Sequence, residues 1–232
     1  MSENIKKIMK AFMADLDSRE NQSIILKPST RPFNNQAHQV NEVAKKIYKL
    51  IEGAKHPDDD IILNHNKIKE AFFSPFKPQL KDAQVFLSYS HADKNKALKV
   101  KNYLESETNH RVFIDSLFWD YKDNIMKEMS KYDNTSKIED AFTLILRESL
   151  QDMIEKCPYF VFLESKNSVS NQGLSCITYS AWIYEELKIA HSIRESRPTP
   201  MMESWQAFHD ISPFLENLET ITLKELSQQI NS

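Results

Sequence analysis

Two short segments of this chain combine residue types that could do chemistry together. The first runs from Val85 to Asp93 and reads Val-Phe-Leu-Ser-Tyr-Ser-His-Ala-Asp. Such an apolar run is typical of a buried strand, and this one delivers a polar loop at its end. The second holds Trp182 and Glu186, whose spacing of four places an indole and a carboxylate on one face of a helix. Together they indicate a nucleotide-handling pocket with a single acidic catalyst.

The polar loop after the first segment has two interpretations. In parallel α/β sheets, ligands bind at the carboxyl ends of strands, so Tyr89, Ser90 and His91 could contact a ribose or a phosphate. Alternatively, the loop is a polar turn that begins the next helix, with Asp93 as its N-cap. The alternative for Glu186 is a solvated helix glutamate beside another glutamate. The sequence leaves these alternatives open.

The composition excludes several classes of protein. The 232 residues carry a net charge of −3, which gives no electrostatic case for binding nucleic acid. The two glycines are too few for a P-loop or a dinucleotide-binding GxGxxG loop. The two cysteines, Cys157 and Cys176, form no CxxC pair, so we expect no metal site and no disulfide framework.

The same sequence predicts the cellular compartment of the protein. No window reaches the roughly 18–20 apolar residues that a membrane span needs. Residues 1–10 carry scattered charges, so we expect no signal peptide there. With two unpaired thiols, these features predict a cytoplasmic protein.

The first third of the chain is predicted to be helical. Apolar residues recur at helical spacing over residues 3–16, and again over 35–52. A third helical segment begins near residue 58, and the prolines of residues 74–78 end it. We therefore predict a helical N-terminal region over residues 1–80, which could be a structural extension, a dimer contact or a partner-binding element.

The remainder of the chain, residues 81–232, is predicted to alternate between β-strands and α-helices. Strands are predicted at residues 83–90, 111–115 and 158–164, and helices at 94–105, 123–155, 180–193 and 222–230. Strands that alternate with helices indicate an α/β fold with a parallel sheet covered on both faces.

Four of these segments, in this order, resemble a Toll/interleukin-1 receptor (TIR) domain. They are Val85 to Asp93, Val112 to Asp115, Tyr159 to Ser170 and Trp182 to Leu187, so the resemblance covers roughly residues 83–195. It implies a flavodoxin-like fold with about five parallel strands. It also implies either protein–protein signalling or cleavage of NAD+ at the nicotinamide–ribose bond, which many bacterial members use in antiphage defence.

The resemblance assigns roles to individual residues. Glu186 would be the catalyst, because a carboxylate beside the ribose stabilises the oxocarbenium-like cation formed as nicotinamide leaves. The loop after the second strand would lie over the nicotinamide, where an aromatic ring could stack on the cationic base. The alternative is that its rings only anchor the loop in the core. The expected substrate-binding residues are Tyr89, Ser90, His91, Asp115, Phe118, Trp119 and Trp182.

The chain departs from the family pattern in three places. The loop after Asp115 lacks the Pro-Gly often found there, and the stretch between Trp119 and Pro158 is longer than usual. The strand expected after the Glu186 helix is poorly marked, because prolines interrupt residues 197–200.

Three functions remain in competition. The leading one is an NAD+ glycohydrolase or cyclase, with NAD+ as substrate, no separate cofactor, self-association through TIR–TIR contacts, and a downstream effector that senses the product. The second is a non-enzymatic TIR scaffold that signals by self-association. The third is an enzyme like the nucleoside deoxyribosyltransferases, which also use a glutamate on such a sheet.

Overall fold

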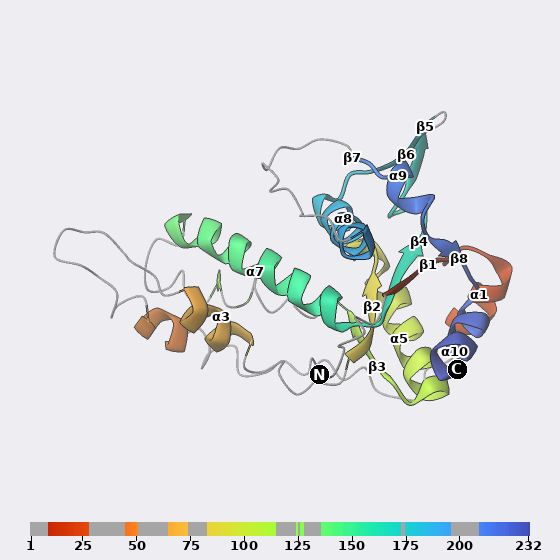
Figure 1. Ribbon diagram of the computed structural model, residues 1–232, viewed down its shortest axis with the longest axis horizontal. Helices are drawn as coiled ribbons and strands as arrows, with labels where there is room; N and C mark the ends of the chain where they lie inside the picture. The colour runs from red at the N-terminus through yellow and green to blue at the C-terminus, as the bar shows by residue number, and fades with distance from the viewer. Residues whose placement is uncertain are drawn as a thin grey trace, which may run out of the picture. The chain divides into compact units, whose positions relative to one another are not determined.

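The computed structural model describes residues 9–27, 45–50, 65–73, 83–114, 124, 126–127, 136–172, 175–195 and 209–232. The chain divides into two compact units (Figure 1). The first consists of residues 1–33, 82–114 and 151–232, and the second of residues 34–81 and 115–150. No described helix is long and apolar enough to cross a membrane.

A five-stranded sheet forms the centre of the first unit. Its order is β3-β2-β4-β1-β8, and every neighbouring pair is parallel. The central strands are nearly continuous in apolar residues because both faces are covered. On one face, Phe86 stacks on Phe160 with ring centroids 5.8 Å apart and on Phe113 at 5.7 Å. The strand bounds are β1 Lys10–Asp15, β2 Ala83–Ser88, β3 Arg111–Ile114, β4 Tyr159–Glu164 and β8 Glu219–Thr220.

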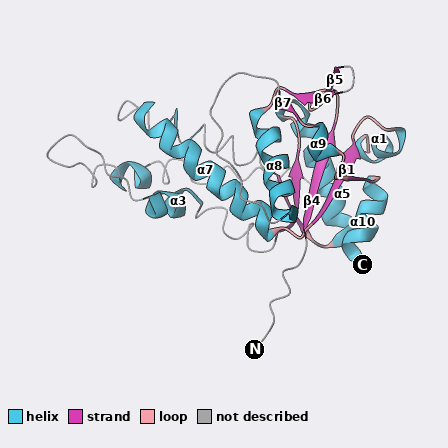
Figure 2. Ribbon diagram, turned by 45° about the horizontal axis from the view of Figure 1, so that its top comes forward, coloured by secondary structure: helices cyan, strands magenta, loops and turns pink. Residues whose placement is uncertain are grey.

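Helices cover this sheet on both faces (Figure 2). Three of them, α1 (Arg19–Ile25), α5 (Lys94–Thr108) and α10 (Leu223–Asn231), pack against one another on one face. The other face carries α8 (Ala181–Glu195), which packs against β2. Parallel connections are right-handed, so the chain places helices on opposite faces when it moves in opposite directions along the sheet. The predicted α/β class with a covered parallel sheet is therefore confirmed.

The N-terminal strand corrects the sequence-based expectation. Residues 10–15, predicted to lie in an amphipathic helix, form β1, which pairs with β4 on one side and β8 on the other. The helical prediction was wrong there because β1 is buried on both faces. Its apolar run shows no period of two, and such a short run also fits a helix. The sheet thus includes residues from before the boundary predicted near residue 80.

The strand order also differs from a simple flavodoxin-like order at one place. Counted from β2, the part β3-β2-β4 follows the 2-1-3 arrangement of that fold. The next place in the sheet is taken by β1 from the N-terminus rather than by a strand after α8.

A small antiparallel sheet takes two strands from the segment between β4 and α8 and a third from after α8. It consists of β5 (Ser170–Gln172), β6 (Ser175–Thr178) and β7 (His209–Asp210). Helix α9 (Ser212–Leu215) follows β7. Tyr184 of α8 stacks on His209 at 4.6 Å and meets Phe214 edge-on at 5.6 Å. These rings hold α8 against the small sheet and α9.

The other predicted elements agree with the structure where it describes them. Helices predicted at 94–105, 180–193 and 222–230 correspond to α5, α8 and α10. In the second unit, residues 45–50 are helical, and α3 spans His65–Phe73. Helix α7 (Ser136–Lys156) begins in the second unit and ends in the first. The remainder of the predicted helix over residues 35–52 lies outside the described residues.

Candidate functional site

The carboxyl edge of the parallel sheet is the candidate site. From β2 the chain moves outward to β3, whereas from β4 it moves the opposite way to β8. Because β2 and β4 are neighbours, their loops diverge to opposite faces, which is the topological switch point where α/β sheets bind ligands. The described loops at this edge include residues 89–93 after β2, residues 165–168 after β4 and residues 16–18 after β1.

Helix α8 brings the predicted catalyst to this edge. It follows β4 through the small sheet and must run back along the parallel sheet, so its first turns lie near the carboxyl edge. Trp182 is in the first turn and is half-buried, whereas Glu186 is 0% exposed. The solvated interpretation of Glu186 is therefore wrong. The neighbouring Glu185, expected to be solvated too, is 4% exposed, and its Oε2 lies 4.0 Å from Lys188 Nζ.

The loop after β2 places the three predicted binding residues at this edge with different exposure. Tyr89 is buried, Ser90 is half-buried and His91 is exposed at the start of a short 3-10 helix, η1 (His91–Asp93). The remaining predicted binding residues, Asp115, Phe118 and Trp119, lie outside the described residues. The structure thus brings Tyr89, Ser90 and His91 to the edge where α8 begins.

Asp93 has a role that the sequence did not reveal. It occupies the N-cap position of α5, as expected, but its side chain makes no capping hydrogen bond. Instead, its buried carboxylate accepts hydrogen bonds from Ser165 Oγ and from Asn167 Nδ2, the latter at 3.0 Å. Lys96 Nζ lies 3.4 Å from Asp93 Oδ1. Asp93 therefore ties the loop after β2 to the loop after β4.

Lys96 extends this tie to the loop after β1. Its Nζ donates to Asp17 Oδ1 at 3.1 Å, and the backbone N–H of Lys166 donates to Asp17 Oδ2 at 3.3 Å. Burial raises the pKa of the Asp17 carboxyl group, but the hydrogen bonds from Lys96 and from the Lys166 backbone, with the charges of the two lysines, outweigh it. The pKa of Asp17 therefore lies below its ordinary value. Likewise, burial opposes the charge on Lys96, but Asp17 and Asp93 raise its pKa. The Lys96 ammonium group thus joins the loops after β1 and β2, and both of its acidic partners also accept hydrogen bonds from the loop after β4.

Glu164, the last residue of β4, shows the opposite effect at the same edge. Burial raises the pKa of its carboxyl group, and the negative charges of Asp15 and Asp17 raise it further. No group of three or more His, Cys, Asp or Glu side chains among the described residues could hold a metal ion. The acidic side chains of this edge therefore form no recognisable cation site within the described part of the chain.

The cysteines lie apart from this chemistry. Burial raises the pKa of the Cys157 thiol to about 12, so it stays protonated and unreactive at neutral pH. Cys176 is half-buried in β6, with Sγ 3.4 Å from Asn171 Oδ1.

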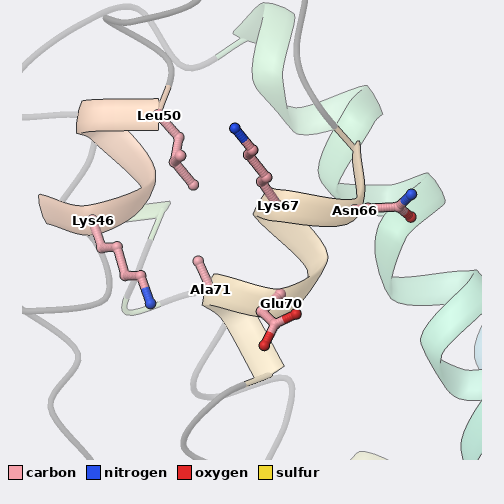
Figure 3. A pocket seen from close by; sticks show the side chains of 6 residues that line it. All are labelled: Lys46, Leu50, Asn66, Lys67, Glu70 and Ala71. Carbon is pink, nitrogen blue, oxygen red and sulfur yellow. The ribbon is translucent and has the colours of Figure 1, made fainter.

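The second unit contains a hollow of about 320 Å³ (Figure 3). The segment 45–50 contributes Lys46 and Leu50, and Figure 3 shows Leu50 pointing into the gap between that segment and α3. Its charged lining residues are two lysines and one glutamate. The lining residues are Lys46, Leu50, Asn66, Lys67, Glu70 and Ala71, none of which belongs to the carboxyl edge.

Comparison with known proteins does not identify a family for this chain. No family model, no curated protein and no solved structure matches the chain. The candidate function therefore rests on the site itself and on the resemblance of its segments to the TIR pattern.

Proposed function

We propose that this protein cleaves the nicotinamide–ribose bond of NAD+ and releases nicotinamide with a linear or cyclised ADP-ribose product. The observation that carries the proposal is the position of Glu186. Its carboxylate has no exposed surface. It lies on α8, whose first turns are near the carboxyl edge of the sheet, and Trp182 lies one turn before it on the same helix. Buried carboxylates are costly, and proteins concentrate them at functional sites.

The chemistry needs little more than such a carboxylate. Nicotinamide leaves as a neutral base from a cationic precursor, so the leaving group needs no strong acid. The ribose carbon becomes positively charged as the bond breaks, and a carboxylate in a water-poor site stabilises that charge far better than one in bulk water. Attack by water then gives linear ADP-ribose, and attack by the adenine of the same molecule gives a cyclic product.

The direct test follows nicotinamide release from NAD+ by chromatography. Glu186→Gln keeps the side-chain shape and removes the charge, so turnover should fall by about 100-fold or more. Glu185→Gln is the matched control, because Glu185 is a buried glutamate on the same helix one position away. It should retain most of the activity.

Other outcomes point to the competing functions. Equal activity in Glu186→Gln and wild type would remove Glu186 from the chemistry. Release of bases from free nucleosides but not from NAD+ would favour the deoxyribosyltransferase-like alternative. A wild-type protein that assembles yet cleaves neither substrate would favour the scaffold.

A further inference from the structure

Ser88, the last residue of β2, carries a buried hydroxyl for which the described residues provide no hydrogen-bond partner. The residue is 0% exposed, and its Oγ has no hydrogen-bond partner in the part of the chain that the structure describes. Other buried serines of the first unit do find partners: Ser168 Oγ donates to the Ser165 carbonyl at 3.1 Å and Ser227 Oγ to the Lys224 carbonyl at 2.7 Å. A buried hydroxyl without a partner costs stability, so its retention calls for an explanation.

The register of the sheet shows which face carries this hydroxyl. Ser88 pairs with Phe162, and Phe86 pairs with Phe160, so these four side chains share one face. Tyr159, one residue before Phe160, points to the other face, where its hydroxyl donates to the Gln229 carbonyl of α10 at 3.4 Å. Ser88 therefore points to the face that α8 covers.

Glu186 belongs to the helix that covers this face. Helix α8 packs against β2, and its early turns lie near the carboxyl edge where Ser88 ends the strand. Both residues are 0% exposed, so neither side chain reaches the surface. A hydroxyl and a carboxylate are thus brought to the same end of the same buried layer, from segments about a hundred residues apart in sequence.

We propose that Ser88 is a substrate-binding residue that hydrogen-bonds the ribose diol next to the bond being cleaved, together with Glu186. This inference rests on the proposed function. A carboxylate only accepts hydrogen bonds, whereas a serine hydroxyl both donates and accepts, and each diol hydroxyl does both. The pair therefore complements two adjacent ribose hydroxyls.

This role makes Ser88 a determinant of specificity for ribose over deoxyribose. A site built to hydrogen-bond a hydroxyl discriminates against the analogue that lacks it. The wild-type protein should prefer NAD+ over its 2′-deoxy analogue at the nicotinamide ribose. Loss of the serine hydroxyl should reduce that preference.

The experiment compares Ser88→Ala with Ser227→Ala, a matched control on α10 at the opposite face. Melting temperatures of the empty proteins come first. Ser88→Ala should be as stable as wild type or more stable, because it removes an unsatisfied hydroxyl. Ser227→Ala should be less stable, because it loses a hydrogen bond. Kinetics then follow: Ser88→Ala should lose about tenfold in kcat/KM for NAD+, and Ser227→Ala should lose nothing.

Kinetics with the 2′-deoxy analogue distinguish a loss of the hydrogen bond to the ribose diol from a general loss of activity in Ser88→Ala. Ser88→Ala should lose much less on the deoxy analogue than on NAD+, so the ratio between the two substrates should shrink. Unchanged kcat/KM in Ser88→Ala would overturn the inference and leave NAD+ cleavage intact. A melting temperature lowered as in Ser227→Ala would overturn it as well, because the hydroxyl would then have a structural partner. A wild-type protein without activity on NAD+ would overturn the proposed function, and this inference would fall with it.

Discussion

Acidic side chains at the ends of adjacent strands ionise differently because their neighbours differ. The pKa of Asp17 is lowered because the Lys96 hydrogen bond and the nearby lysine charges outweigh its burial. Glu164 ends the next strand, and its pKa is raised by burial and by the carboxylates of Asp15 and Asp17. Neither difference is visible in the sequence, because it depends on which charges the fold brings together.

The raised pKa of Glu164 makes a pH-dependent contribution to stability. The folded protein holds this proton to a higher pH than the unfolded chain does, so the contribution is complete below the ordinary value of 4.5. It is lost as the pH rises through the raised folded pKa. Glu164→Gln keeps the side chain neutral at every pH and avoids that loss. Its melting temperature should therefore exceed that of wild type at pH 7–8, and the difference should vanish near pH 4.

Thermal melts from pH 4 to pH 8 check this expectation. Glu107→Gln, at an exposed position of α5, is the control and should follow the wild type. A melting-temperature difference between Glu164→Gln and wild type that stays constant over this range would contradict the charge argument.

The connections between loops decide how rigid the candidate site is. Asp93 accepts from Ser165 and Asn167, and Lys96 joins it to Asp17, so the loops after β1, β2 and β4 form one connected network. A network whose members are all hydrogen-bonded holds its loops in one arrangement. The loop after β4 leads through the small sheet into α8, so this network helps to fix the helix that carries Glu186.

Asp93 and Asp17, which both contact Lys96, should contribute very differently to the unfolding free energy. Asp93 is buried, and Asp93→Ala removes the carboxylate that accepts hydrogen bonds from Ser165 and Asn167, so it should cost about 2–4 kcal/mol of unfolding free energy. Asp17 is exposed, and Asp17→Ala should cost less than about 1 kcal/mol. Urea unfolding measures both. Equal losses in the two variants would show that Asp93 is not the centre of the network.

The fold as a whole depends on its N-terminal strand. β1 lies between β4 and β8, and Phe12 and Ala14 within it are buried. Without β1, the edge of β4 would expose unpaired backbone groups, and β8 would lose its partner strand. The parallel sheet is therefore assembled from both ends of the chain, and its middle holds residues that are more than a hundred positions apart.

Removal of the first 80 residues tests this dependence. A chain of residues 81–232 should fail to fold cooperatively, because it lacks a central strand. Circular dichroism melts and solubility in comparison with the full chain measure the effect. Phe12→Ala in the full chain should cost about 3–5 kcal/mol, and Lys10→Ala, at an exposed position of the same strand, should cost little. A cooperative melt of the 81–232 chain would contradict this expectation and support the predicted boundary near residue 80.

Local patterns in the sequence were sufficient for several elements. Alternation of apolar strands with amphipathic helices predicts β2, α5, β3, β4, α8 and α10, and it predicts a parallel sheet covered on both faces. The spacing of Trp182 and Glu186 places them on one helix, and the β2 segment delivers Tyr89 to Asp93 to the edge. These features follow from a period of two or of 3.6 residues, which any short window of sequence contains.

The remaining features depend on contacts between distant parts of the chain. Four features depend on residues far away in sequence. They are the place of β1 in the sheet, the burial of Glu186, the hydrogen bonds around Asp93 and the burial of the Ser88 hydroxyl. Ser165 and Asn167, for example, lie 72 and 74 residues from Asp93. Periodicity indicates which faces of an element are apolar. Only the packed fold decides which strand lies beside which, and hence which polar groups share a buried layer.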